Sequence, residues 1–388
     1  MKITKLMLSA CVAALAMVSC NKVEPDVIEN TSLKSVKLSF ENAIMTKGAA
    51  GEKISAGSQV QMNDFKIFLT DESYSGTYSA MDATGTNAAK FYFTAADLTT
   101  DKKYEFHYVD HKCTRVVVVA NVGDMTFEDV KKYTQTIDKQ QDQTNLILVA
   151  DAALQATSEK HNPNAEKYTE VYKAELTLKP VISRFEVDGF SVAFSETPKF
   201  NKIEVRDIAF LHYYPSVSFT TENGVFEAVA TGAHVKPIED FSSESQVMTW
   251  FNNADNKGWF RDSFDNQIVM LPDDKTTEDV KENVVDAPAP LAYHLYAGNL
   301  VPTMVIKVLA DGNPSYVYTE KFKLGTTEGY LNKLEGGKIY RMSAAGVADQ
   351  TGGSIVIPDD LDPIERCLDI TVDVVDWVVE LVTPDFGK

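Results

Sequence analysis

The chain has 388 residues, of which 44% are hydrophobic, and this length predicts two domains or one large β-domain. Its formal net charge is -19, from 56 acidic and 37 basic residues. Such an acidic surface repels phosphate backbones and anionic lipid headgroups, which excludes nucleic acid as a partner.

Residues 1–20 are predicted to be a lipoprotein signal peptide. Lys2 and Lys5 precede an uncharged apolar run, residues 6–18, which is too short to anchor a chain across a bilayer. The run ends in Met17-Val18-Ser19-Cys20, a lipobox pattern with Met where Leu is commoner, in which the cysteine receives acyl chains such as palmitate. An ordinary signal peptide with an incidental cysteine is the alternative. The lipoprotein interpretation is favoured because Cys20 stands at the expected cleavage point and a polar tether follows.

Alternation of apolar and polar residues then predicts many half-buried strands. Val36, Leu38 and Phe40 form the first such set. Similar sets follow at Phe65, Ile67 and Leu69, at Tyr104, Phe106 and Tyr108, and at Tyr172, Ala174, Leu176 and Leu178. The β-branched run Arg115–Ala120 predicts a central strand that is covered on both faces. Later strands are expected at Ile203–Val205, Gln267–Leu271, Thr303–Leu309 and Tyr316–Leu324, with turns at residues 311–314 and 335–337.

Helical signals are few. Thr126 followed by Asp129 forms a capping box for a short helix that ends near Tyr133. The pattern therefore predicts an all-β protein with two β-sandwich domains of transthyretin-like or Greek-key type and one or two short helices. Lys179-Pro180 marks the expected boundary, with one domain over residues 48–180 and the other over 181–388. The acidic, proline-rich residues 273–290 are expected to form an exposed loop.

Cysteines and histidines give no clear chemical site. Cys113 and Cys367 could form a disulfide in an exported protein, but two separate buried thiols are favoured. His107 and His111 form a two-residue set too small to predict zinc, and surface histidines are expected instead.

The other polar motifs also predict no metal, phosphate or catalytic site. The acidic run at Asp359, Asp360 and Asp362 lacks the glycine and distal glutamate of a calcium loop. Neither a phosphate-binding loop nor a Gly-x-Ser-x-Gly elbow occurs in the sequence. The sequence therefore predicts no enzyme, no catalytic residue, no metal and no cofactor.

Trp250 and Trp259 lie among asparagines and could stack on sugar rings. A role in pinning a loop onto the second domain is favoured about three to one, because large aromatic residues mostly serve packing. A monomeric glycan-binding surface lipoprotein is the alternative function that this cluster keeps open.

The end of the chain carries two alternating apolar sets whose phase slips by one residue. The first set is Leu368, Ile370, Val372 and Val374, and the second is Val375, Trp377, Val379 and Leu381. A one-residue slip turns side chains to the opposite face, so it predicts a bulge or the end of one strand and the start of another. Such a terminal strand must either close its own sheet or enter the groove of another subunit.

Taken in order, several motifs resemble the Bacteroidales fimbrillins, the FimA-like major subunits of type V pili. The motifs are Cys20, the strand from Lys34 to Phe40 followed by Lys47-Gly48, the run Arg115–Asn121 with its helix, Ser183–Val187, Lys338-Ile339-Tyr340, and Thr371-Val372 with Trp377.

This resemblance implies a cell-surface fimbrial subunit that supports adhesion, reaches the outer membrane as a lipoprotein and polymerises by strand exchange. Cys20 would carry the lipid, and a protease would cut between Lys47 and Gly48 to remove residues 21–47 with the first strand, Val36, Leu38 and Phe40. Lys47 stands where arginine is usual, and Lys53 is a second candidate. Residues 368–381 would be the donor strand for other copies or related fimbrial subunits, and a host or bacterial surface ligand is a further implied partner.

Overall fold

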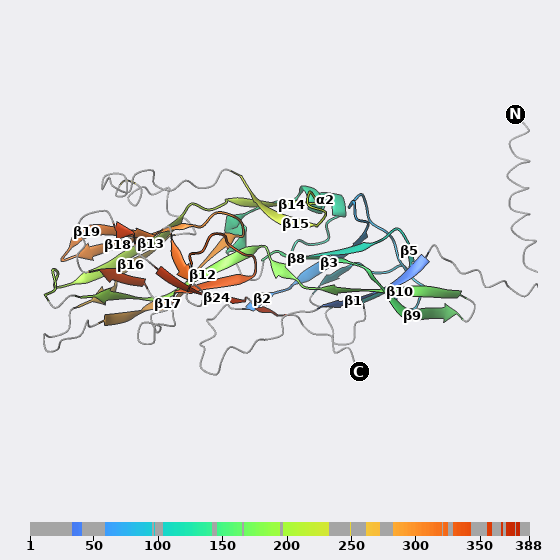
Figure 1. The fold of residues 1–388 in the computed structure, drawn as a ribbon, viewed down its shortest axis with the longest axis horizontal. Helices are drawn as coiled ribbons and strands as arrows, with labels where there is room; N and C mark the ends of the chain where they lie inside the picture. The colour runs from blue at the N-terminus through green and yellow to red at the C-terminus, as the bar shows by residue number, and fades with distance from the viewer. Residues whose placement is uncertain are drawn as a thin grey trace, which may run out of the picture.

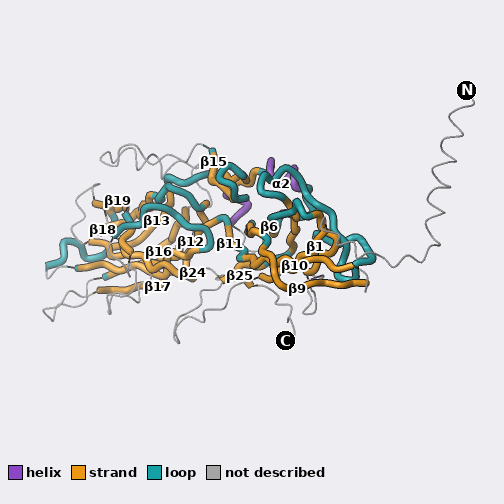
Figure 2. The backbone as a smooth tube through the Cα atoms, turned by 45° about the vertical axis from the view of Figure 1, so that its right-hand side comes forward, coloured by secondary structure: helices purple, strands orange, loops and turns teal. Residues whose placement is uncertain are grey.

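The fold is all-β, as the sequence predicts, and strands fill both ends of an elongated molecule (Figures 1 and 2). It comes from a computed structural model that describes the following residues: 33–40, 59–94, 97, 104–141, 146–164, 167–194, 197–232, 249, 261–271, 282–319, 321–324, 329–342, 355–358, 366–367, 370–376 and 378–380. One α-helix, α2 (Phe127–Lys132), and one short 3₁₀ helix, η2 (Ile137–Gln140), occur in this part of the chain.

Strands of residues 33–180 form two sheets, which we call the first lobe. One sheet has the order β5-β1-β10-β9, with β1 (Leu33–Phe40), β5 (Tyr104–Asp110), β9 (Gln155–Asn164) and β10 (Lys167–Leu176). The other has the order β11-β8-β6-β3-β4, with β3 (Asp64–Thr70), β4 (Tyr92–Thr94), β6 (Arg115–Ala120), β8 (Leu148–Ala153) and β11 (Lys179–Pro180).

Strands of residues 182–376 form two further sheets, the second lobe. One has the order β17-β12-β21-β24-β20, and β22 also pairs with β12; its strands are β12 (Ile182–Ala193), β17 (Glu282–Tyr296), β20 (Phe322–Leu324), β21 (Lys338–Met342), β22 (Ile355–Pro358) and β24 (Ile370–Asp376). The other has the order β16-β13-β18-β19-β23, with β13 (Ile203–Leu211), β16 (Arg261–Met270), β18 (Thr303–Ala310), β19 (Asn313–Thr319) and β23 (Arg366–Cys367).

Two small sheets join residues from both parts of the chain. One has the order β15-β14-β7, with β7 (Thr134–Thr136), β14 (Ser216–Thr220) and β15 (Glu227–Thr231). The other pairs β2 (Gln59–Gln61) with β25 (Val378–Glu380) in parallel. Strand pairing therefore changes partners at Val181, between β11 and β12, while these two sheets bridge the division.

The central strand of the first lobe is β6, as its β-branched sequence predicts. It pairs with β3 on one side and β8 on the other, and the side chains of Val116, Val117, Val118 and Val119 are fully buried. Phe68 of β3 lies on the outer face of this sheet, where its ring packs 4.9 Å from that of Phe127 in α2. The helix therefore covers a second apolar face and explains why consecutive valines are buried.

The helix itself forms where the capping box predicts it. Thr126 Oγ1 accepts a hydrogen bond from the backbone N–H of Asp129, and the two side chains are joined at 2.6 Å. Phe127 and Val130 form the buried face of this short helix. A side chain satisfies one of the free amides of the first turn, which is the reason for the sequence signature.

The predicted turn at residues 311–314 is a two-residue hairpin loop between β18 and β19. Ala310 pairs with Asn313, and Asp311 and Gly312 have φ values of 48° and 86°. Positive φ at both central positions suits the right-handed twist of the two strands, and Asp-Gly is a favoured pair for it. The predicted strand Tyr316–Leu324 is divided into β19 and β20, because Thr319 Oγ1 bonds both the backbone N–H and the carbonyl of Lys321.

Alternation fails in β5, where Tyr108 was expected to follow Tyr104 and Phe106 into the core. Tyr108 instead has φ 56°, and the register of β1 against β5 shifts at the same level. At this level two consecutive side chains, Phe106 and His107, are buried, and Val109 is buried while Tyr108 is only half-buried. A local bulge of this kind leaves no mark in an apolar pattern.

The sequence predicts an exposed loop over residues 273–290, and this prediction is wrong for the second half of the segment. Residues 282–286 pair with β12, and only residues 272–281 lie outside the described part of the chain. Between the pairs Val187–Leu291 and Gly189–Asp286 the register shifts, which leaves Ala-Pro-Ala-Pro at residues 287–290 without a ladder partner. The prolines that suggested a loop occupy this bulge, where no N–H is required.

The two lobes are joined by hydrogen bonds around His294 of β17. Its Nδ1 lies 2.6 Å from the carbonyl of Gln140 in η2, and its Nε2 lies 3.1 Å from Arg184 Nη1. Gln141 bonds both the N–H and the carbonyl of His294, at 3.2 and 3.0 Å. Arg184 also holds Glu186 at 2.7 Å, and all these charged groups are buried. Buried polar groups of this kind require fixed partners, so they set how the lobes join.

Candidate functional site

The place occupied by β1, between β5 and β10, is the candidate functional site, and we call it the β1 seat (Figure 1). β1 runs parallel to β10 from Lys34 to Phe40 and antiparallel to β5 from Leu33 to Leu38. Lys34, Val36 and Leu38 each pair on both sides. The seat is therefore an interior position of a sheet that a strand near the start of the described chain fills.

The floor of the seat is apolar. Val36 and Leu38 are buried, and Phe40 packs edge-to-face on Phe65 at 5.6 Å and on Tyr104 at 5.4 Å. Burying each such side chain contributes about 1.5–3 kcal/mol. The structure thus confirms a strand at the predicted removable residues and places all three on the core.

The first end of the seat holds a cation. Lys34 is only 4% exposed, and its ammonium donates hydrogen bonds to the carbonyl of Cys113 and, at 3.4 Å, to that of His111. The same Nζ lies 4.2 Å from the centre of the Tyr172 ring. Desolvation by burial lowers the pKa of Lys34, opposed by the nearby Cys113 and Asp110. Two carbonyls and an aromatic face therefore form a subsite for a desolvated ammonium group.

Next to it, a hydroxyl of β1 is held by residues from two other strands. Ser35 is fully buried, and its Oγ lies 2.8 Å from His107 Nδ1 and 2.6 Å from Thr169 Oγ1. The rings of His107 and His161 stack at 3.8 Å with an interplanar angle of 15°. Burial first, and His161 second, lower the pKa of His107, which favours its neutral form.

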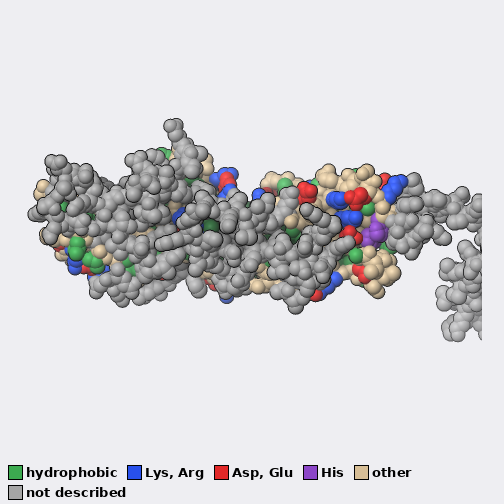
Figure 3. Space-filling view, turned by 90° about the horizontal axis from the view of Figure 1, so that it is seen from below, with side chains coloured by type: hydrophobic (Ala, Val, Ile, Leu, Met, Phe, Trp, Pro, Cys, Tyr) green, Lys and Arg blue, Asp and Glu red, His purple; other side chains and the backbone are tan. Residues whose placement is uncertain are grey.

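A third polar position lies on the outer side of the sheet. Lys37 Nζ lies 3.0 Å from Glu159 of β9 and 3.7 Å from Glu105 of β5, and Lys173 of β10 also contacts Glu159. Charged side chains of both signs gather with histidine at this end of the molecule (Figure 3). Lys37 of β1 therefore contacts both carboxylates, and Glu159 also contacts the cation that β10 supplies.

The predicted surface position of the histidine pair is correct for His111 and wrong for His107. The His111 side chain is 57% exposed, whereas His107 is 1% exposed because the bulge at Tyr108 turns it toward Ser35. The two therefore share no face. Among the described residues, no group of three or more His, Cys, Asp or Glu is arranged to hold a metal ion.

Of the predicted thiols, Cys113 is free and fully buried, as expected for a small apolar residue. Burial raises its pKa to about 12, so the thiol stays protonated and unreactive near neutral pH. The backbone of Cys367 lies in β23, paired with Tyr318. Within the part of the chain that the structure describes, no helix has the length and apolar character needed to cross a membrane.

The predicted donor residues lie in the second lobe. Ile370, Val372 and Val374 belong to β24, which pairs with β20 through residues 370–372 and with β21 through residues 373–376. β25 begins at Val378 and pairs with β2 instead. The two strands therefore have different partners, close to the predicted slip between Val374 and Val375, and neither occupies the β1 seat.

Several predicted site residues lie outside the described residues. They are Cys20, Lys47, Gly48, Trp250, Trp259, Leu368, Trp377 and Leu381, together with the acidic run at 359–362. The polar contacts of Lys34 and Ser35 were not predicted from the sequence. The only sequence signal for these contacts is a lysine and a serine at the start of an alternating strand. Their hydrogen-bond partners lie 72 to 134 residues away in the chain, so the sequence pattern does not identify them.

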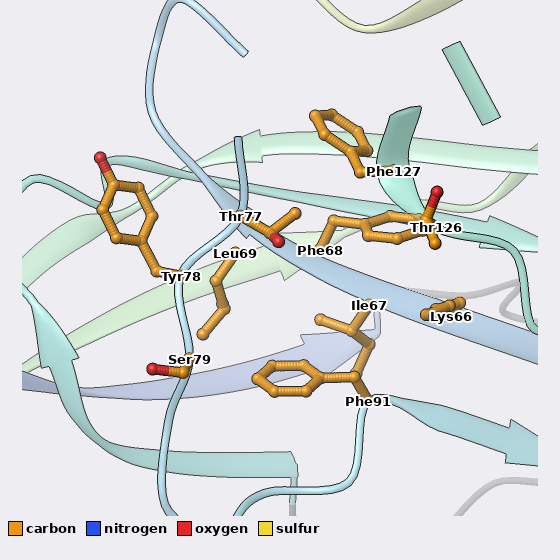
Figure 4. Close-up of a pocket in the computed structure, with 10 residues that line it drawn as sticks. All are labelled: Lys66, Ile67, Phe68, Leu69, Thr77, Tyr78, Ser79, Phe91, Thr126 and Phe127. Atoms are coloured by element: carbon orange, nitrogen blue, oxygen red, sulfur yellow. The ribbon is translucent and has the colours of Figure 1, made fainter. Parts of the chain in front are cut away.

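The first lobe also contains a pocket of about 380 Å³ between β3, residues 77–79 and α2. The rings of Phe68, Phe91 and Phe127 surround it, with Ile67 and Leu69 from β3 (Figure 4). The polar residues that line it are Lys66, Thr77, Tyr78, Ser79 and Thr126. The pocket is separate from the predicted site residues.

No protein-family model matches the chain, and no curated protein matches it in sequence. Similar solved structures are cell adhesion and fimbrial proteins of Bacteroidales. A candidate cell adhesion protein of Parabacteroides distasonis is 13% identical, with a TM-score of 0.52 over 90% of this chain and 98% of that one. The fimbrilin FimA of Porphyromonas gingivalis is 10% identical, with a TM-score of 0.45 over 90% and 98%.

The fimbrial anchor protein of Porphyromonas gingivalis is 10% identical, with a TM-score of 0.31 over 82% of this chain and 94% of that one. Of these three, the Parabacteroides protein exceeds a TM-score of 0.5. At such low identity the likeness concerns the fold, and the chain shares its all-β fold with that candidate cell adhesion protein.

Proposed function

We propose that the chain is a structural subunit of a cell-surface fimbria that supports adhesion and binds other copies or related fimbrial subunits. In this proposal it is exported as a lipoprotein acylated at Cys20, reaches the outer membrane surface, and is cut between Lys47 and Gly48. Two β-sandwich domains, residues 48–180 and 181–388, remain after the cut. A strand from residues 368–381 of another subunit then replaces β1.

The observation that carries the proposal is the interior position of β1. Both its edges pair, and three of its side chains pack on the core, so its loss would open a gap in the middle of a sheet. A gap with free backbone groups on both sides and an apolar floor accepts an extended strand. Residues 41–58 separate β1 from β2, and Lys47 lies among them. A cut there would leave β1 held only by non-covalent contacts.

Polymer formation is tested on the trimmed protein that keeps all residues after the cut. We expect ladders on SDS gels that collapse on boiling, because a buried strand with a full ladder dissociates slowly. Deleting residues 368–388 should abolish the ladders, and N-terminal sequencing of shed protein should begin at Gly48. Persistence of the ladders after that deletion would contradict the donor assignment.

The cleavage position is tested by a matched pair of variants. Lys47→Gln should block trimming and polymerisation together, whereas Lys53→Gln should leave both intact. The reverse result would move the cut to Lys53. If neither variant affects trimming, the proposed cleavage after these lysines is wrong.

A further inference from the structure

The polar contacts of the β1 seat allow the alignment of the donor strand to be specified, and this inference rests on the strand exchange proposed above. We propose that residues 366–372 of a second copy enter the seat in the direction of β1, with Arg366 in the place of Lys34. On the apolar floor, the places of Val36, Leu38 and Phe40 are then taken in order by Leu368, Ile370 and Val372. The donor therefore begins two residues before the first apolar residue of the tail.

Four alignments put three alternating apolar residues of the tail on the floor in the direction of β1. They differ in the residue that takes the place of Val36, which is Leu368, Ile370, Val375 or Trp377. In the first alignment an arginine comes to the place of Lys34, whereas the other three bring a leucine, an aspartate and a valine there. Arg366 is also the only lysine or arginine within residues 342–387 of the sequence, so a single alignment supplies a cation.

The place of Lys34 suits a buried cation. Lys34 is 4% exposed, and its ammonium donates hydrogen bonds to the carbonyls of Cys113 and His111. The centre of the Tyr172 ring lies 4.2 Å from the same nitrogen. A guanidinium group stacks on aromatic faces, carries more N–H donors than an ammonium group and keeps its charge when buried. An apolar residue would remove the hydrogen bond that the Cys113 carbonyl accepts, and a carboxylate would be repelled by that carbonyl and by the ring face.

The place of Ser35 distinguishes the alignments a second time. Ser35 is fully buried, and its Oγ lies 2.8 Å from His107 Nδ1 and 2.6 Å from Thr169 Oγ1. In the proposed alignment Cys367 comes to this place, and its thiol is an uncharged group that donates and accepts weakly. Two of the other alignments bring an aspartate here, which would bury a carboxylate beside a histidine whose neutral form is favoured.

The exposed places of the seat fit the donor less well, but their effect is smaller. Asp369 takes the place of Lys37, whose Nζ now lies 3.0 Å from Glu159 and 3.7 Å from Glu105, so a third carboxylate joins these two. The Lys37 side chain is 32% exposed, and solvent screens much of the repulsion at such a place. The buried match at Lys34 therefore outweighs the mismatch at Lys37.

A second mismatch lies at the first end of the seat. Glu365 takes the place of Leu33, opposite Asp110, whose side chain is 46% exposed. Solvent screens this pair as well, so the repulsion at both mismatches should weaken when salt is added. Salt should therefore strengthen the joint between two copies.

In their own lobe, the described residues of this donor each pair on one edge. Arg366 and Cys367 form β23, the edge strand beside β19. Residues 370–372 pair only with β20, among the strands that the structure describes. Release of these residues therefore breaks one ladder rather than two.

The alignment is tested with the full chain, which carries a recognition sequence for a site-specific protease within residues 41–58 and a fluorophore ahead of β1. After the cut, β1 stays bound, and added peptides compete for the seat, so release is followed as a loss of fluorescence anisotropy. The parent peptide covers residues 364–374, and a second peptide covers residues 373–381. The variants of the parent are a scrambled control, Arg366→Met, Arg366→Lys, Arg366→Glu, Cys367→Ser, Cys367→Asp and Asp369→Lys.

We expect Arg366→Met and Arg366→Glu to weaken displacement about tenfold or more, because each removes the donors to the buried carbonyls. Arg366→Lys should keep most of it, because the seat already accepts an ammonium group at this place. Cys367→Ser should displace β1 more strongly than the parent and Cys367→Asp more weakly. Asp369→Lys should improve displacement by a factor that shrinks at about 1 M salt.

A disulfide trap gives the alignment directly. Lys37 lies opposite Glu105 in the antiparallel ladder, so the donor residue that takes its place should react with a Glu105→Cys protein. The peptides carry Cys367→Ser and one new cysteine, Asp369→Cys or Thr371→Cys, activated as a mixed disulfide. The proposed alignment predicts trapping through Asp369→Cys, whereas Thr371→Cys is the matched control that reports an alignment shifted by two residues. The protein with Glu105 unchanged gives the background, because its Cys113 is fully buried.

The outcomes separate this inference from the function on which it rests. Trapping through Thr371→Cys, or equal displacement by the parent and Arg366→Met peptides, would overturn the alignment and leave strand exchange intact. Stronger displacement by residues 373–381 than by residues 364–374 would likewise overturn it. Displacement by neither of these two peptides would contradict strand exchange itself, and the alignment with it.

Discussion

β1, the first strand of the described chain, and β24, its last long strand, are held in different ways. In β1, residues such as Lys34, Val36 and Leu38 pair with neighbours on both sides. In β24, residues 370–372 pair only with β20 and residues 373–376 only with β21, among the strands that the structure describes. A strand whose residues pair on both edges opens only when two ladders break together. The comparison teaches that β24 should detach more readily than β1.

The largest expected effect comes from placing a charge on the floor of the seat. Val36→Asp buries a carboxylate without a partner and should lower the free energy of unfolding by about 3–5 kcal/mol. Val374→Asp in β24 is the matched substitution, and we expect a smaller loss. Denaturant unfolding measures both, and an equal or larger loss at Val374 would break the comparison.

The second effect concerns the buried ammonium. Lys34→Met keeps the length of the side chain but removes the donor to the Cys113 carbonyl, and it should cost about 1–3 kcal/mol. Lys132→Met, in the last turn of α2, is the control and should change stability little. Hydrogen exchange of β1 amides locates the loss, and unchanged protection there would mean that the ammonium does not hold the strand.

The third effect is a dependence on pH. The pKa of folded His107 lies below its ordinary value near 6.5 because of burial and then His161, so the folded form binds its proton less readily than the unfolded chain. Stability should therefore fall as pH drops below about 6.5, until the lower folded pKa is reached. His107→Gln should flatten this slope, whereas exposed His111→Gln should not. Equal slopes in both variants would exclude His107 as the cause.

The smallest effect is expected on the outer side of the seat. Lys37→Gln removes partly exposed contacts with Glu159 and Glu105, so we expect a slight loss of stability at low salt. The difference from the unchanged protein should vanish at 1 M salt. A loss that salt does not reduce would show that packing of the lysine stem, rather than its charge, matters at this position.

Local patterns in the sequence predicted the elements that depend on local physics. The capping box at Thr126, the buried run at Arg115–Ala120 and the alternation of Val36, Leu38 and Phe40 each fix a conformation or a face without reference to distant residues. The Asp311-Gly312 hairpin loop belongs to the same class, because positive φ is a property of the residues themselves.

The features that the sequence did not predict correctly depend instead on distant residues. The bulge at Tyr108 and the strand at residues 282–286 depend on partners that alternation does not name, β1 in one case and β12 in the other. The polar half of the seat is of this kind too, since Lys34 and Ser35 meet groups from three segments that only the fold brings together. A pattern gives the face of a strand, but the chemistry beside it comes from the topology.

The β1 seat lies in the first lobe, while the last long strand, β24, lies in the second (Figure 1). Contacts between unlike surfaces repeat head to tail and need not close, whereas contacts between like surfaces stop at a pair. A filament assembled through the seat would therefore be polar. One end of the filament would display a vacant β1 seat, and the other end would display a donor strand that has not paired. Different proteins could therefore control initiation and termination.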